Sequence, residues 1–136
     1  MYRVLQLSPN PELGGAFNQP VNDMDRVNFY LGHLNQISRA VEEFDAPVSA
    51  VHFRSLMDSF NRHFGTEQKY GFFRTDFLSE KRDVHIKRSG EWLQKFIRNR
   101  DFNPEKKDIL FGRFSKDFLF GAGTSAFQHE SSISLG

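Results

Sequence analysis

The chain has 136 residues, enough for one domain with one core and too few for two. Its 18 basic and 17 acidic residues leave a net charge of +1, which gives no electrostatic case for nucleic acid or an anionic membrane as a partner. Cysteine is absent, which excludes disulfides and thiolate sites. Because no apolar run suits a signal peptide or a membrane span, we expect a soluble cytoplasmic protein.

The first 20 residues are expected to form an N-terminal arm. Pro9 and Pro11 exclude a regular helix in its second half. From Asp23 to Phe44 the apolar residues recur at three- and four-residue intervals, which predicts an amphipathic helix. The arm therefore leads into the first helix of the domain.

Three more helices are expected along the rest of the chain. Asp45 is a suitable N-cap for a second helix, which would fray around residues 70–71, and a third would begin near Asp76 or Ser79. The pair Asn103-Pro104 is typical of a helix start and predicts a fourth helix.

The fourth helix would stop at Gly121, and residues 123–136 would form a flexible tail rich in serine and glycine. Helices joined by short connections bury their apolar stripes best as an up-down-up-down bundle. The predicted fold class is therefore all-α, a four-helix bundle over residues 21–122 with an N-terminal arm and a short C-terminal tail.

The most informative motif is His63-Phe-Gly-Thr-Glu67. On a helix, His63 and Glu67 lie one turn apart on the same face, where they can bind a metal ion together with donors from neighbouring helices. The alternative is a histidine that only forms a hydrogen bond with a glutamate, and the spacing leaves both interpretations open.

This motif and three others, in the same order along the chain, resemble those of bacterial hemerythrin domains. The motifs are Met24-Asp-Arg-Val-Asn28-x-x-Leu31, His63-Phe-x-x-Glu67, His85-x-x-x-Ser89-x-x-Trp92-Leu93 and Ile109-Leu110-x-x-Arg113-x-x-x-Asp117. The resemblance implies a four-helix bundle around a di-iron site with five histidines and two carboxylates. It assigns His63, Glu67 and His85 to ligand positions, with Asp117 one residue from the expected spacing.

Several ligands of that site are replaced. Asn28, Ser89 and Arg113 stand where the resemblance implies histidines. In one interpretation Arg113 supplies the positive charge of the lost metal and forms a residual core network with Asn28 and Ser89. The protein would then be a binding or regulatory module without a cofactor or catalytic residues, acting through a protein partner, a homodimer or a small ligand.

In the other interpretation one metal ion remains, with iron favoured. His63, Glu67, His85 and Asp117 would bind a single non-haem metal for oxygen or nitric-oxide sensing. An ordinary oxygen carrier is excluded by the missing ligands. If the resemblance is real, the residues of all four motifs must gather in one buried pocket between the helices.

Overall fold

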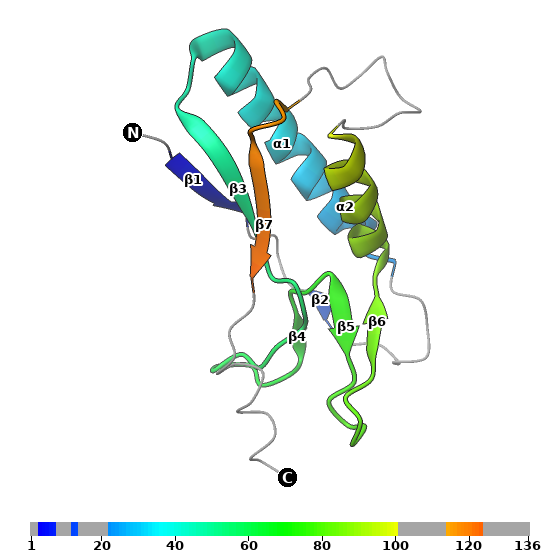
Figure 1. Cartoon of the computed structure of the whole chain (residues 1–136). Helices are drawn as coiled ribbons and strands as arrows, with labels where there is room; N and C mark the ends of the chain where they lie inside the picture. The colour runs from blue at the N-terminus through cyan, green and yellow to red at the C-terminus, as the bar shows by residue number, and fades with distance from the viewer. Residues whose placement is uncertain (1–2, 8–11, 14–21, 101–113, 124–136) are drawn as a thin grey trace.

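The computed structural model describes residues 3–7, 12–13, 22–100 and 114–123. Its central element is a parallel three-stranded sheet with the strand order β1-β3-β7, formed by β1 (Arg3–Leu7), β3 (Val48–Arg54) and β7 (Leu119–Gly123). Val51 at the middle of β3 lies opposite Leu5 on one side and Phe120 on the other. The three strands therefore end at one common edge, which we call the carboxyl edge (Figure 1).

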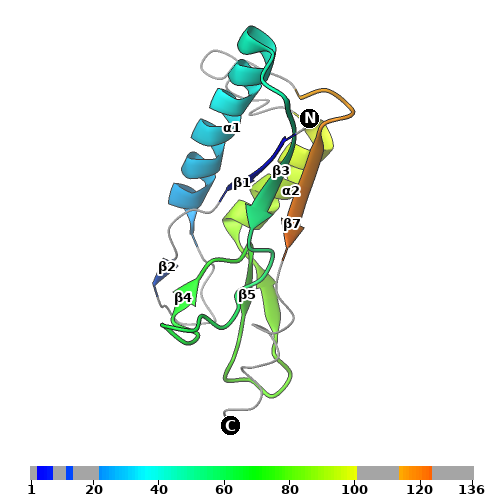
Figure 2. The same ribbon diagram turned by 90° about the vertical axis from the view of Figure 1, so that its left-hand side faces the viewer.

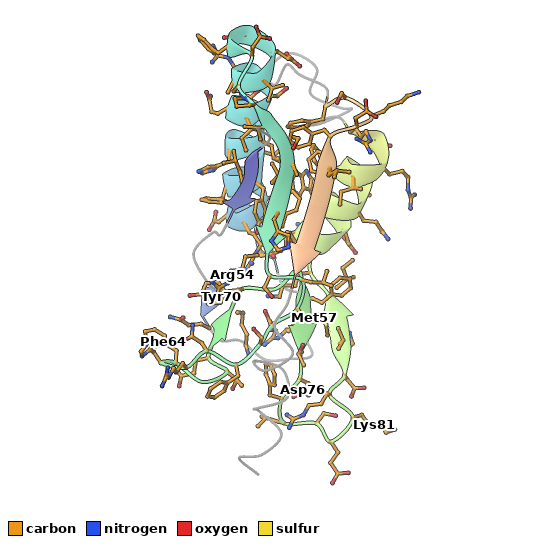
Figure 3. All side chains as sticks on the ribbon, turned by 60° about the vertical axis from the view of Figure 1, so that its left-hand side comes forward. Arg54, Met57, Phe64, Tyr70, Asp76 and Lys81 are labelled. Atoms are coloured by element: carbon orange, nitrogen blue, oxygen red, sulfur yellow. The ribbon has the colours of Figure 1, made fainter. Side chains whose placement is uncertain are left out.

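Two helices connect the parallel strands. Helix α1 (Met24–Phe44) lies between β1 and β3 in the chain, and α2 (Arg88–Asn99) lies between β3 and β7. Both helices lie behind the sheet in the view of Figure 3 and leave its other face uncovered by any described helix. The order of elements is that of repeated βα units in a parallel sheet.

Residues 55–87 leave the carboxyl edge after β3 and return at the start of α2, and we call this segment the excursion. It contains three short strands, β4 (Gln68–Lys69), β5 (Phe73–Thr75) and β6 (Val84–Ile86). Strand β4 pairs antiparallel with β2 (Glu12–Leu13), and β5 pairs antiparallel with β6. Figure 2 shows all four of these strands beyond the arrowheads of the parallel sheet.

The core between the helices and the sheet is built from aromatic rings. Tyr30 of α1 is completely buried, with its ring centroid 5.3 Å from Phe72 in a stacked arrangement and 5.1 Å from Phe53 in an edge-to-face arrangement. Stacked and edge-to-face pairs of this kind add to the stabilisation from burial alone. The cluster is Tyr30, Leu34, Ile37, Val51, Phe53, Phe72, Leu93, Phe96, Phe114 and Phe118.

Alternation along β3 separates the two faces of the sheet. Val51 and Phe53 are buried in the core, so His52 and Arg54 point to the face that the helices do not cover. The His52 ring lies beside β7, where a Cβ atom on Gly123 would approach its Cε1 to 2.8 Å. Glycine at that position therefore makes room for the imidazole.

The predicted four-helix bundle is wrong. The second predicted helix contains strand β3, the third contains β6 before α2, and the last described part of the fourth is β7. Short segments that mix apolar and polar residues, such as Val48–Arg54, fit the periods of a helix and of a strand, and pairing with β1 and β7 decides between them. Asp45 caps no second helix, because its left-handed φ of 50° ends α1.

The helix predicted from Asp23 to Phe44 is confirmed as α1. Residues 104–113 of the predicted fourth helix lie outside the described residues, as do most of the predicted arm at 1–20 and tail at 123–136. Within the described ranges, no helix combines the length and the apolar character needed to cross a membrane.

The aromatic core gives a first prediction. Replacing Phe53 by Ala removes a fully buried ring and should lower the free energy of unfolding by about 3–5 kcal/mol. The control is Leu78→Ala, since Leu78 is 97% exposed and its loss should change stability by less than about 0.5 kcal/mol. Urea unfolding of the two variants measures both values. Equal effects would contradict the described core.

A second prediction concerns alkaline pH. Burial raises the pKa of the Tyr30 hydroxyl above its ordinary value of about 10, although the neighbouring Arg26 charge opposes this rise. Above about pH 10 the unfolded chain releases the Tyr30 proton while the folded protein keeps it. The free energy of unfolding therefore falls by up to about 1.4 kcal/mol per pH unit. Below about pH 10 both states keep the Tyr30 proton, and its contribution to stability is fully present.

The Tyr30→Phe variant lacks this ionisable group and serves as the comparison. Urea unfolding at about pH 9 and about pH 11 should show a larger loss of stability in the unmodified protein than in the variant. If the free energy of unfolding falls equally with pH in both proteins, the Tyr30 pKa is the same in the folded and unfolded states, which contradicts the prediction.

Candidate functional site

A buried ion pair holds the excursion against the start of α2. The Asp58 carboxylate is completely buried, and its Oδ1 lies 2.9 Å from Nζ of Lys87, which is also almost fully buried. Oδ1 also accepts a hydrogen bond of 2.8 Å from the backbone N–H of Gly71. No described donor reaches Oδ2, so the charge of Asp58 depends on Lys87 for its compensation.

A second buried ion pair lies where α1 begins. Asp23 Oδ2 is 3.2 Å from Nε of Arg26, and both side chains are almost fully buried. The Asp23 carboxylate also accepts hydrogen bonds from the backbone N–H of Ser89, at 2.8 Å, and from the Ser89 hydroxyl. Since Ser89 is in the first turn of α2, this carboxylate joins the beginnings of the two helices.

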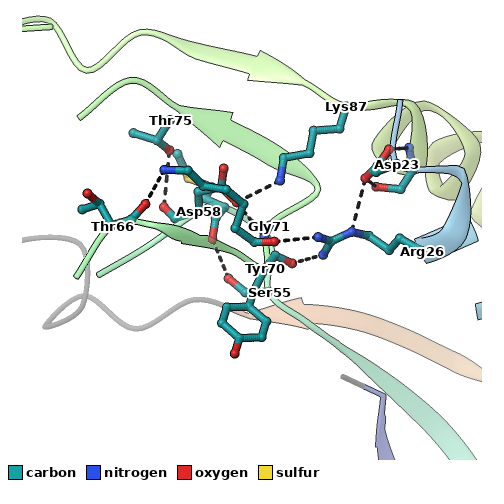
Figure 4. A network of polar contacts seen from close by, with 12 residues as sticks. Asp23, Arg26, Ser55, Asp58, Thr66, Tyr70, Gly71, Thr75 and Lys87 are labelled. Carbon is teal, nitrogen blue, oxygen red and sulfur yellow. Dashed lines mark hydrogen bonds and ion pairs between the residues drawn. The ribbon is translucent and has the colours of Figure 1, made fainter. Parts of the chain in front are cut away.

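The two pairs are connected through the backbone of residues 69–71 (Figure 4). The Arg26 guanidinium donates to the carbonyl oxygen of Lys69 at 2.7 Å and to that of Tyr70. Gly71, the next residue, donates to Asp58. We call Asp23, Arg26, Asp58, Lys87 and Ser89 the carboxyl-edge network. It ties both helix starts and the excursion to the same edge of the sheet.

Gly71 permits the close approach of two backbone segments in this network. A Cβ atom at this position would come within 2.2 Å of the Asp58 nitrogen and of the Met57 carbonyl carbon. Neighbouring hydrogen bonds fix the same approach, because Ser55 N–H donates to Tyr70 O at 3.2 Å and Phe72 N–H donates to Ser55 O at 3.1 Å. These contacts hold residues 55–58 and 70–72 of the excursion against each other.

Arg54, the last residue of β3, presents its exposed side chain at this edge. Its guanidinium lies 5.8 Å from the centroid of the Tyr70 ring, and Figure 3 shows the two residues together below the end of β3. On the excursion, burial lowers the pKa of the Lys69 amine. Lys69 donates a hydrogen bond to the carbonyl oxygen of Thr66.

The residues predicted to bind a metal do not come together in a described pocket. His63 and Glu67 are exposed in the turns of the excursion, His85 is exposed on β6, and Asp117 is exposed in the turn before β7. The shared helix face on which the metal site was argued does not exist, because residues 61–67 are not helical. Across the described ranges, no group of three or more histidines, aspartates or glutamates is arranged to hold a metal ion.

The predicted residual core network is not assembled either. Asn28 is exposed on α1, whereas Ser89 is buried against Asp23, and Arg113 lies outside the described residues. Of the residues singled out from the sequence, Ser89 alone belongs to the carboxyl-edge network.

Sequence patterns carry little signal for the other network residues. Asp23 marks only the point where helical periodicity begins. Nothing in the sequence separates Lys87 from the exposed basic residues near it, because lysine is seldom fully buried. Asp58 stands among the apolar residues Leu56, Met57 and Phe60, which is a weak indication of a buried carboxylate.

The Asp58–Lys87 pair gives a third prediction. Replacing Lys87 by Met leaves the Asp58 carboxylate buried without its cation and should lower the free energy of unfolding by about 3–5 kcal/mol. Adding Asp58→Asn removes the unpaired charge and should restore part of that loss. Lys81→Met, at an exposed lysine of the excursion, is the control and should have little effect. A small loss in Lys87→Met, measured by urea unfolding, would contradict the buried pair.

Comparison with known proteins identifies the family to which this architecture belongs. The family model described as glycosyl hydrolase family 1 matches residues 12–102. β-Glucosidase 5 of Oryza sativa subsp. japonica is 30% identical over 95 residues, which cover 70% of this chain and 18% of the relative. Lactase/phlorizin hydrolase of Homo sapiens is 26% identical over 117 residues, covering 85% of this chain and 6% of the relative.

A third relative is the 1,4-β-D-glucan glucohydrolase of Thermotoga neapolitana, which is 30% identical over 94 residues, covering 65% of this chain and 20% of the relative. The chain thus spans about a fifth or less of the length of these relatives. The family folds as a (βα)8 barrel, and the βαβαβ order with its helices on one face of a parallel sheet agrees with that architecture.

These matches overturn the resemblance to bacterial hemerythrins, and with it the iron-dependent oxygen or nitric-oxide sensor and the regulatory module with a degraded di-iron site. The motifs that carried the resemblance are short, and the structure scatters their described residues over α1, the excursion, α2 and the turn before β7. A family match over 91 of the 136 residues outweighs them, and the chain belongs to glycosyl hydrolase family 1.

Proposed function

We propose that the protein binds β-glycosides at the carboxyl edge of its parallel sheet and takes part there in their hydrolysis. The names of the relatives, β-glucosidase and 1,4-β-D-glucan glucohydrolase, point to β-linked glucose as the substrate class. Membership of the family supports the reaction type, and the architecture supports the place where it occurs.

The observation that carries the proposal is the position of the excursion. In (βα)8-barrel enzymes the active site is built from the segments that follow the carboxyl ends of the strands. Residues 55–87 follow β3 at this edge, and the carboxyl-edge network holds them there. A binding site on such a rigid support keeps its geometry when a sugar arrives.

Glycoside hydrolysis requires two carboxyl groups, roughly 5–5.5 Å apart in retaining enzymes and roughly 6.5–9.5 Å apart in inverting ones. Asp23 and Asp58 do not suit this role, because each is buried and paired with a cation. They support the site, and the reacting carboxyl groups would come from other residues. This chemistry uses no metal, so a single bound metal ion has no part in the proposal.

A second function is glycoside binding without hydrolysis. It is favoured by the ion pairs of Asp23 and Asp58, which leave neither carboxylate available for the reaction. Among the described residues, the buried carboxyl groups at the edge are both committed to ion pairs. Such a protein would recognise the sugar and leave the glycosidic bond intact. The protein partner or homodimer and the cytoplasmic location expected from the sequence stay predictions under either function.

Two measurements on the full chain test the proposal. A β-C-glucoside, in which a carbon atom replaces the glycosidic oxygen so that it cannot be hydrolysed, is titrated into isotope-labelled protein and should shift the NMR signals of residues at the carboxyl edge in a saturable manner. The matched α-C-glucoside is the control and should bind more weakly. Release of nitrophenol from 4-nitrophenyl β-D-glucoside then separates the two functions, since binding without release indicates the second. Absence of both binding and release would contradict both.

A further inference from the structure

Arg54 is placed rigidly at the end of the central strand. Its carbonyl oxygen accepts a hydrogen bond of 3.1 Å from the hydroxyl of the buried Tyr30. The two residues that follow are also fixed, because Ser55 N–H donates to Tyr70 O and Leu56 N–H donates to Gly123 O at 3.1 Å. The backbone from which the Arg54 side chain projects therefore connects directly to the aromatic core and to β7.

The guanidinium of Arg54 has a ring beneath it and no acidic partner. The Tyr70 ring, 5.8 Å away, is held by its hydroxyl, which donates to the Gln68 side-chain oxygen at 3.0 Å. Among the described residues, no carboxylate forms an ion pair with Arg54. A cation–π contact with an aromatic face orients a guanidinium while leaving its N–H groups able to donate in the guanidinium plane.

The carboxyl-edge network supplies no free negative charge to compensate Arg54. The two carboxylates of that network are neutralised by Lys87 and Arg26. His52, two residues earlier on β3, points to the same uncovered face roughly 6.6 Å along the strand. The carboxyl edge thus presents the positive charge of Arg54, with His52 two residues earlier on the strand, on the face that no described helix covers.

We propose that Arg54 makes this edge selective for β-glycosides that carry an anionic group, a carboxylate or a phosphate ester, on the sugar. The planar fork of a guanidinium matches the paired oxygens of these groups, and hydrogen bonds between charged partners are about twice as strong as neutral ones. The inference rests on the proposed function, because it requires a glycoside to bind at the carboxyl edge.

Three ligands of matched shape test it by NMR titration of the full chain. Methyl β-D-glucoside is neutral, methyl β-D-glucuronide carries a carboxylate, and methyl 6-phospho-β-D-glucoside carries a phosphate. At least one anionic ligand should bind about tenfold more tightly than the neutral one at low salt, and the difference should shrink at high salt. The tighter of the two anionic ligands identifies the anion.

Variants assign the preference to Arg54. In Arg54→Leu the ratio of the neutral to the anionic dissociation constant should fall toward one, and Arg54→Lys should restore only part of it because the fork is lost. Arg98→Leu, at an exposed arginine in the last turn of α2 and outside the excursion, is the matched control and should keep the ratio. Thermal unfolding verifies that each variant is folded, which the exposure of the Arg54 side chain leads us to expect.

The outcomes separate this inference from the function on which it rests. Equal affinity for neutral and anionic glycosides, or a preference that survives Arg54→Leu, overturns the inference and leaves the proposed function standing. If none of the three ligands binds, both fail together.

Discussion

Charge compensation inside the protein is the constraint on which the carboxyl edge depends. Asp58 with Lys87, and Asp23 with Arg26, place four charged groups where water does not reach them. A buried charge is tolerated only when it is paired and hydrogen-bonded, so each pair fixes the segments that supply it. Those segments are the starts of both helices and the excursion. The excursion begins at this edge because it follows β3 in the chain, and these contacts hold it against the helix starts.

The aromatic core and the edge are coupled through a single side chain. The Tyr30 ring packs between Phe53 and Phe72, while its hydroxyl donates to the carbonyl oxygen of Arg54. Phe72 lies on the excursion, and its backbone N–H donates to Ser55. Packing in the core and the geometry of the edge are thus determined by overlapping sets of contacts. This arrangement resembles the support that well-ordered binding sites receive from the residues around them.

The two faces of the sheet have different roles because side chains alternate along each strand. On β3, Val51 and Phe53 join the core under the helices, whereas His52 and Arg54 point away from it. In a family that folds as a (βα)8 barrel, helices cover the outer face and the strand ends carry the site. The same alternation therefore places one set of β3 residues in the core and leaves the other on the uncovered face.

The sequence by itself determined α1, because a long amphipathic period from Met24 to Phe44 is decided by residues within the helix. It did not determine β3, whose short sequence fits both a helical and a strand period. Pairing with β1 and β7, from distant parts of the chain, makes it a strand. The metal site predicted from the sequence was wrong for the same reason. Spacing placed His63 and Glu67 on one helix face, but the excursion is not helical, and the buried pairing of Asp58 with Lys87 spans 29 residues. Only tertiary structure brings such groups together, since the two charges attract each other strongly only when the folded chain places them in contact away from water.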